Sequence, residues 1–116
     1  MKKVEHILTK LPVRFMKDTY KIIWSDEALN NLRDIIDYLE IRWSKKELKK
    51  FSKLLDKKLE SIKIRPQLYP QSNKSKGLRR CVLSKQTTIY YRLNEFEIRI
   101  ISLFDNRQHP NKIKDN

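Results

Sequence analysis

The segment LRRCVLSKQTTIYYRLNEFEIRIISLFDNRQHP, residues Leu78 to Pro110, decides the fold of this 116-residue chain. Runs of β-branched and aromatic residues predict three strands within it, at Leu78–Leu83, Thr88–Leu93 and Phe96–Phe104. The connections between these strands are short, so neighbouring strands are expected to pair in the antiparallel sense. Such a sheet must bury at least one face, and the residues that precede it must supply the cover.

Two amphipathic helices come before the sheet. Apolar residues recur at three- and four-residue spacing over Asp26–Trp43 and again over Lys45–Ile64, which predicts one helix in each range. Ser25 stands at the N-cap position of the first helix, and Ser44 begins a capping-box pattern at the second. The minimal turn between them predicts an antiparallel α-hairpin, with Trp43 as the last member of the first apolar stripe.

These elements predict an α+β fold, in which an N-terminal α-hairpin packs on a small twisted antiparallel sheet of three to four strands. Tyr20–Trp24 is the candidate for the fourth strand. Pro66 and Pro70 end the second helix and begin a loop, and we expect Leu68 and Tyr69 to hold that loop against the core.

The chain divides into one domain and two flanking segments. We interpret residues 1–19 as an N-terminal extension or a misassigned start, residues 20–110 as a single domain, and residues 111–116 as a polar tail. No apolar run approaches the roughly 20 residues that span a bilayer. The single cysteine, Cys81, excludes an intrachain disulfide and is interpreted as a packed thiol. These features predict a cytoplasmic protein that does not bind membranes.

The net charge of +13 is concentrated in one part of the chain. From Lys45 to Lys85 there are 14 basic and 3 acidic residues, a net of +11, and the remainder holds 27 − 14 = 13 basic and 14 − 3 = 11 acidic residues. This asymmetry predicts an anionic partner, either nucleic acid or an acidic protein. The residues expected to bind the anion are Lys50, Lys53, Lys57, Arg80 and Lys85. The alternative is a solvated helix face without a partner.

A polar cluster after the last strand could support ribonuclease chemistry. Asp105, Arg107 and His109 lie within five residues, and RNA cleavage needs a base, an acid and cations on the developing charge. Arg79 at the start of the sheet would add a cation, whereas the adjacent Arg80 must point to the opposite face. The alternative is that Asp105 and Arg107 pair and fix the chain where it leaves the sheet. One glycine cannot form a phosphate-binding loop, and the scattered His and Cys residues have no metal-ligand spacing, so no cofactor and no metal are expected.

The adjacent Tyr90 and Tyr91 also point to opposite faces of the predicted sheet. Either ring could stack on a base, as aromatic residues do in single-stranded nucleic-acid sites. Packing within the protein is the favoured interpretation for both, and more strongly so for Tyr91.

The joint order of these patterns resembles the RelE/ParE superfamily of toxins from bacterial type II toxin–antitoxin systems. The resemblance covers about Tyr20 to Pro110. It rests on Ile23-Trp24-Ser25, Ala28, Leu32, Ile35, Tyr38, Phe51, Leu55, Leu59, Ile62, Pro66, Pro70, Leu78-Arg79-Arg80, Ile89-Tyr90-Tyr91, Ile98–Ile101 and Phe104-Asp105-Asn106-Arg107-Gln108. Membership implies a cognate antitoxin, whose acidic segment is expected to dock on the α-hairpin and the sheet edge and to form a hetero-oligomer with the toxin.

The superfamily has two main branches that differ in target. RelE-like members cleave mRNA on the ribosome without a metal, and ParE-like members poison DNA gyrase. Arg79 and Arg107 match basic residues of the RelE-like site, but Thr88 and Cys81 stand where that site has further basic residues. The C-terminal tyrosine of RelE has no counterpart here, and His109 is the one candidate to replace it.

These gaps favour a ParE-like, growth-inhibiting toxin that acts on DNA gyrase. The alternative is a RelE-like, ribosome-dependent endoribonuclease that uses Arg79, Arg107 and His109 as catalytic residues. A further alternative is an inactive basic module that binds nucleic acid or the antitoxin. Whether the protein is an enzyme therefore stays open at this point.

Overall fold

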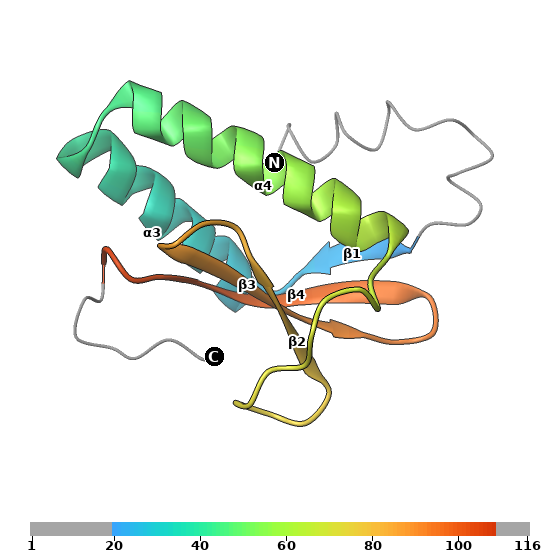
Figure 1. Ribbon diagram of the computed structural model, residues 1–116. Coiled ribbons are helices and arrows are strands. Elements are labelled where there is room, and N and C mark those ends of the chain that lie inside the picture. The colour runs from blue at the N-terminus through green and yellow to red at the C-terminus, as the bar shows by residue number, and fades with distance from the viewer. Residues whose placement is uncertain (1–19, 109–116) are drawn as a thin grey trace.

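The computed structural model describes residues 20–108 (Figure 1). Its elements, in chain order, are β1 (Lys21–Trp24), α3 (Asp26–Arg42), α4 (Lys45–Ile64), β2 (Leu78–Val82), β3 (Thr87–Leu93) and β4 (Glu97–Asp105). This order confirms the predicted α+β fold of an α-hairpin and a small sheet. The predictions about the N-terminal extension, the polar tail and His109 lie outside the described residues.

The four strands form one mixed sheet in the order β1-β4-β3-β2. The pairs β2–β3 and β3–β4 are antiparallel, as predicted, but β1 runs parallel to β4, with Lys21 opposite Glu97. The prediction of a purely antiparallel sheet was therefore wrong for this edge strand. A tight turn forces its two strands to be antiparallel, whereas β1 joins the sheet through the whole α-hairpin and can lie parallel.

Both helices cover the same face of the sheet (Figure 1), and both begin at the predicted serine caps. The Ser44 hydroxyl accepts a hydrogen bond from the Glu47 amide at 3.1 Å. The Ser25 hydroxyl accepts from the Ala28 amide at 3.0 Å and donates to the Ile101 carbonyl at 2.8 Å. Ile101 is the additional residue of a bulge in β4, since Tyr90 and Tyr91 pair with Ser102 and Ile100. The first cap thus also joins α3 to the sheet.

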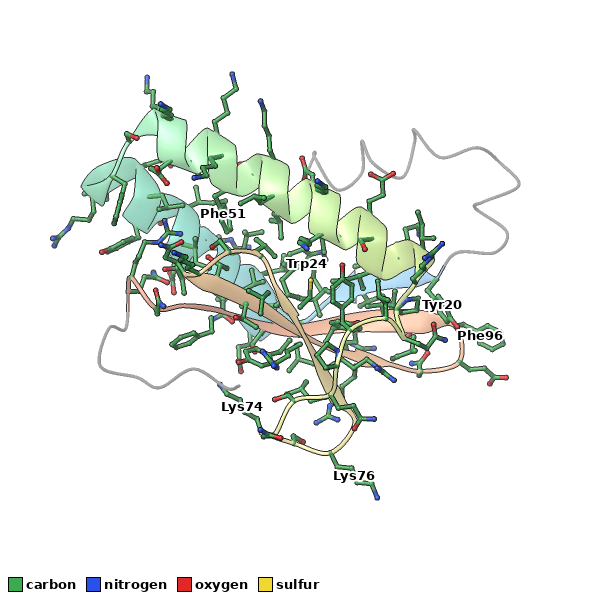
Figure 2. The ribbon with its side chains drawn as sticks, in the orientation of Figure 1. Tyr20, Trp24, Phe51, Lys74, Lys76 and Phe96 are labelled. Carbon is green, nitrogen blue, oxygen red and sulfur yellow. The ribbon has the colours of Figure 1, made fainter. Side chains whose placement is uncertain are left out.

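The hydrophobic core lies between the α-hairpin and this face of the sheet. Phe51 points from α4 into that space (Figure 2). Tyr91 is fully buried, and its hydroxyl donates to the Pro66 carbonyl at 2.7 Å. Cys81 is also fully buried, which confirms both packing predictions. The other core residues include Ala28, Leu32, Ile35, Leu39, Leu55, Leu59, Ile62, Ile89, Ile98 and Ile100.

Two predicted core contacts are absent. Trp43 is 50% exposed, because α3 ends at Arg42 and the backbone at Trp43 leaves the helical conformation, with φ −120° and ψ −115°. The side chain therefore no longer follows the stripe of α3. Leu68 is 62% exposed, whereas Tyr69 packs against the core as predicted, and its hydroxyl lies 2.7 Å from the Ser61 hydroxyl.

The loop between α4 and β2 folds over part of the other face of the sheet (Figure 1). Arg92 donates to the Lys76 carbonyl and to the Ser75 hydroxyl, both at 2.8 Å. The Lys74 ammonium lies 4.6 Å from the centroid of the Tyr90 ring, and Tyr90 is only 1% exposed, so it packs within the protein. Figure 2 shows Lys74 and Lys76 on the side away from the helices. Neither α3 nor α4 is long and apolar enough to cross a membrane.

Candidate functional site

The two helices of the hairpin carry opposite net charge. The α4 sequence holds eight lysines against three acidic residues, whereas α3 holds five acidic residues against two arginines. The lysines at positions 45, 46, 49, 50, 53 and 57 are all exposed, so the predicted anion-binding residues Lys50, Lys53 and Lys57 lie on one accessible helix. This charge separation favours the approach of an acidic partner to α4 rather than to α3.

Asp105 is the centre of the polar cluster that follows β4. Its carboxylate is 1% exposed and accepts a hydrogen bond from the Thr87 hydroxyl at 2.8 Å. It also accepts from Nε and Nη2 of Arg107 at 3.1 and 2.8 Å, and from the Arg107 amide at 2.9 Å. The two side chains therefore form the bidentate pair that the sequence offered as the alternative to a catalytic site.

Arg107 also connects this cluster to the hairpin. Its Nη1 atom is 4.0 Å from a carboxylate oxygen of Glu47, and its guanidinium carbon is 5.5 Å from the centroid of the Trp43 ring. Its carbonyl accepts a hydrogen bond from the Tyr38 hydroxyl at 3.1 Å. Arg107 is thus held by contacts to both helices and to the end of β4.

A small hollow of about 50 Å³ opens beside Arg107, between α4 and the β2–β3 turn. Its lining includes Lys50, Leu54 and Gln86, together with Glu47. The backbone carbonyl of Lys85 in the same turn accepts a hydrogen bond from the side-chain amide of Asn106 at 3.2 Å. Ligand pockets usually measure about 300 Å³ or more, so this hollow has room for water or one side chain but not for a nucleotide.

Arg79 lies elsewhere on the sheet. Its Nη1 atom donates to the carbonyls of Tyr69 at 2.7 Å and Gln67 at 3.4 Å, which fixes the loop before β2. Arg79 pairs with Tyr91 of β3, and Asp105 pairs with Thr87, four residues away along the same strand. At about 3.3 Å per residue this separates Arg79 from Asp105 by roughly 13 Å along the strand direction, and β3 also lies between the two strands that carry them. The structure therefore does not bring the two predicted catalytic arginines together.

Arg80 points to the opposite face from Arg79, as predicted, since it pairs with Tyr90. It is half-buried, and within residues 20–108 its Nε atom is buried without a hydrogen-bond partner. Arg80 is thus on the face of the sheet that lies away from the lysines of α4, so it does not form one surface with the predicted anion-binding residues Lys50, Lys53 and Lys57.

Burial controls the shifted pKa values of the described residues. Desolvation raises the pKa of the Cys81 thiol to about 11, against a smaller opposing effect of the Lys58 charge. Burial also raises the pKa of Tyr91 and lowers the pKa of Lys63, whose ammonium donates to the Tyr20 carbonyl at 2.6 Å. Cys81 and Tyr91 therefore stay protonated at neutral pH and are not poised as a nucleophile or a base. No group of three or more His, Cys, Asp or Glu residues between positions 20 and 108 is placed to hold a metal.

Comparison with known proteins identifies the family. Residues 22–110 match the family model described as the ParE toxin of type II toxin–antitoxin system, parDE. The chain belongs to the ParE toxin family. The match confirms the predicted membership of the RelE/ParE superfamily of type II toxins. No curated protein sequence matches the chain significantly.

Solved structures show how this ParE-family fold recurs. A structure of the chromosomal ParDE toxin–antitoxin system from P. aeruginosa gives a TM-score of 0.60 at 17% identity, over 74% of this chain and 95% of that one. A copper-bound mutant toxin from Helicobacter pylori gives a TM-score of 0.55 at 14% identity, over 78% of this chain and 98% of that one. The YoeB dimer from Staphylococcus aureus gives a TM-score of 0.51 at 20% identity, over 73% of this chain and 94% of that one. At these identities the similarity is one of fold.

The sequence did not reveal the contacts of Trp43 and Glu47 with Arg107. Glu47 takes part in the predicted capping pattern through its amide, and its carboxylate also meets Arg107, 60 positions later in the chain. Trp43 was predicted to be a core residue and contacts the same arginine instead. The one local sign was that Trp43 directly precedes the N-cap Ser44, a turn position where a large apolar side chain has no helix on which to continue its stripe.

Proposed function

We propose that this ParE-family toxin inhibits growth by binding DNA gyrase rather than by cleaving RNA. The supporting observation is the state of the two arginines that a nuclease site would need. Arg79 is bound to loop carbonyls and Arg107 to Asp105, and the β3 partners of Arg79 and Asp105 lie four residues apart along that strand, roughly 13 Å. The match to the ParE family model points in the same direction.

Energetics argue against a catalytic use of Arg107. To stabilise a phosphorane it would have to leave Asp105, a carboxylate that is 1% exposed. Breaking a buried ion pair typically costs about 3–5 kcal/mol, because one charge stays buried without a partner. Arg107 is better suited to maintain a rigid surface than to follow developing charge in a transition state. Inhibition by binding requires only that surface and its charge.

We further propose that an acidic segment of a cognate antitoxin docks on α4 and an edge of the sheet. The exposed lysines of α4 support this proposal. The start of the β2 edge is already paired, because the backbone amide of Ser72 donates to the Leu78 carbonyl and that of Arg80 donates to the Pro70 carbonyl. The β1 edge, at the opposite side of the sheet, is therefore the favoured place for an added strand.

Two assays on the purified protein test the choice of target. In the first, gyrase supercoils relaxed plasmid with increasing toxin, and we expect loss of supercoiling together with trapped, cleaved DNA. In the second, the toxin is added to a translating extract, and transcript ends are mapped by sequencing. Intact transcripts are expected. Arg79→Gln is the matched variant, because it removes the cation but keeps a donor for the Tyr69 carbonyl, and it should retain gyrase inhibition.

The opposite pattern would support the alternative function. Ribosome-dependent cuts in mRNA that disappear in Arg79→Gln, with gyrase unaffected, would identify a RelE-like endoribonuclease. Harmless expression without antitoxin, together with no effect in either assay, would leave an inactive binding module.

A further inference from the structure

Trp43 is a large aromatic side chain that the fold places at the surface. It is 50% exposed, although the periodicity of α3 assigns it to the core. Its backbone is fixed, since its amide donates to the Leu39 carbonyl at 3.1 Å. Tryptophan is strongly enriched among the residues that dominate binding energy in protein interfaces.

The guanidinium of Arg107 packs against the Trp43 ring. The guanidinium carbon lies 5.5 Å from the ring centroid, and the arginine side chain is only 12% exposed. Because Asp105 binds that guanidinium in a bidentate manner, the Trp43 ring rests on a support that does not need to be ordered during binding. A pre-ordered side chain loses little entropy on association, which favours affinity.

The charges around Trp43 are arranged in two zones. At the centre, the positive charge of Arg107 is balanced by Asp105 at 2.8 Å and Glu47 at 4.0 Å. Exposed cations stand close to Trp43 and Glu47 in the chain, namely Arg42, Lys45, Lys46 and Lys50, and Lys50 lines the same hollow as Arg107. The centre is therefore aromatic and not cationic, and the positive charge lies at the rim.

This arrangement fits a protein surface better than a nucleic acid. A phosphate that approached Arg107 would meet the carboxylates of Glu47 and Asp105, whereas an apolar recess could take the Trp43 ring. Protein interfaces typically have such an apolar centre with a polar rim, and lysines at the rim would complement acidic side chains on the partner. Figure 1 shows that the α3–α4 turn and the segment after β4 lie at the same end of the molecule, so this surface is formed by both.

We propose that this end of the molecule binds an acidic surface of the toxin's protein target, with Trp43 as the anchor in an apolar recess of that target. The surface, here called the tip surface, consists of Trp43, Arg107, Glu47, Lys46 and Lys50. The inference rests on the proposed function, in which the toxin acts by binding gyrase, and it names the part of the toxin that makes the contact.

Substitution of Trp43 tests the proposal with gyrase inhibition and direct gyrase binding as readouts, in the absence of antitoxin. Trp43→Ala should raise the toxin concentration for half-inhibition by roughly 30-fold, since truncation of such anchors commonly costs about 2 kcal/mol or more. Trp43→Phe keeps a ring over Arg107 and should therefore lose less inhibitory potency than Trp43→Ala. Phe96→Ala is the matched control, because Phe96 is an aromatic residue that is 72% exposed at the β3–β4 turn. This variant should inhibit gyrase like the wild type.

The outcomes separate this inference from the proposed function. Wild-type toxin that inhibits gyrase, with a folded Trp43→Ala variant of equal potency, overturns the tip surface and leaves the function standing. Wild-type toxin that neither binds nor inhibits gyrase overturns the function, and the target assigned to the tip surface with it. A Trp43→Ala variant that loses antitoxin binding while it still inhibits gyrase would assign the surface to the antitoxin and overturn the proposal. A defect that appears only when DNA is present would assign it to DNA, with the same consequence. Thermal unfolding of each variant shows whether the fold is retained.

Discussion

At the scale of single residues, Asp105 links the sheet to the segment that follows β4. It binds Thr87 in the neighbouring strand and Arg107 in the segment that follows, and Arg107 in turn supports Trp43. A carboxylate that is 1% exposed is stable only because these donors replace water. The same bonds hold Arg107 in place beneath the proposed tip surface.

Asp105→Ala should lower the free energy of unfolding by about 3–5 kcal/mol, because it leaves the Arg107 cation buried with only the distant Glu47 carboxylate. Urea unfolding followed by circular dichroism measures this loss. The matched control is Glu97→Ala, which removes an ion pair to Arg99 of 3.7 Å between half-exposed side chains and should cost under about 1 kcal/mol. Equal losses of unfolding free energy in the two variants would mean that burial of the Asp105–Arg107 pair does not add to its contribution to stability.

At the scale of secondary-structure elements, the two helix caps have the same chemistry but different surroundings. Ser25 and Ser44 each accept a hydrogen bond from the amide three residues later. Ser44 is exposed at the hairpin turn, whereas Ser25 also donates to the Ile101 carbonyl in the bulge of β4. The hydroxyl of Ser25 therefore positions α3 on the sheet in addition to starting the helix.

Ser25→Ala should consequently destabilise the protein more than Ser44→Ala. Loss of a serine cap costs about 1 kcal/mol, and the unpaired Ile101 carbonyl should add about a further 1 kcal/mol. Chemical denaturation of both variants under identical conditions gives the difference directly. A larger loss for Ser44→Ala would contradict the role of Ser25 as a link between α3 and β4.

The sequence predicted the elements themselves because each has a strong local pattern. The helix α4 begins and ends at the predicted residues, and the strands agree to within one or two residues at each end. The parallel direction of β1, the bulge at Ile101 and the exposure of Trp43 were not predicted, because each depends on where distant segments meet. The same holds for the candidate site. The Asp105–Arg107 pair could be anticipated from its spacing, but the binding of Arg79 by loop carbonyls depends on a loop path that no local pattern specifies.

At the scale of the whole molecule, the net charge of +13 is unevenly distributed, so the electrostatic potential differs between surfaces of the protein. The α4 helix is net positive and the neighbouring α3 helix is net negative, although the two pack side by side. An acidic partner is therefore drawn toward one helix of the hairpin, and such steering acts mainly on the rate of association. Because the Debye length at 0.1 M salt is about 10 Å, the effect must weaken as salt is added.

Reversal of charge on α4 should consequently slow the association with the antitoxin far more than the same change elsewhere. The triple variant Lys49→Glu, Lys53→Glu and Lys57→Glu lowers the net charge by six, and we expect an association rate at least about tenfold lower at low salt, with a flatter dependence on ionic strength. The control is Arg33→Glu, Lys76→Glu and Arg99→Glu, which makes the same change in net charge at exposed positions outside α4 and should slow association by less than about threefold. Stopped-flow or surface-based kinetics across a salt series measures both. Equal slowing in the two variants would show that only the total charge matters, and the field of α4 would then have no part in choosing where the antitoxin binds.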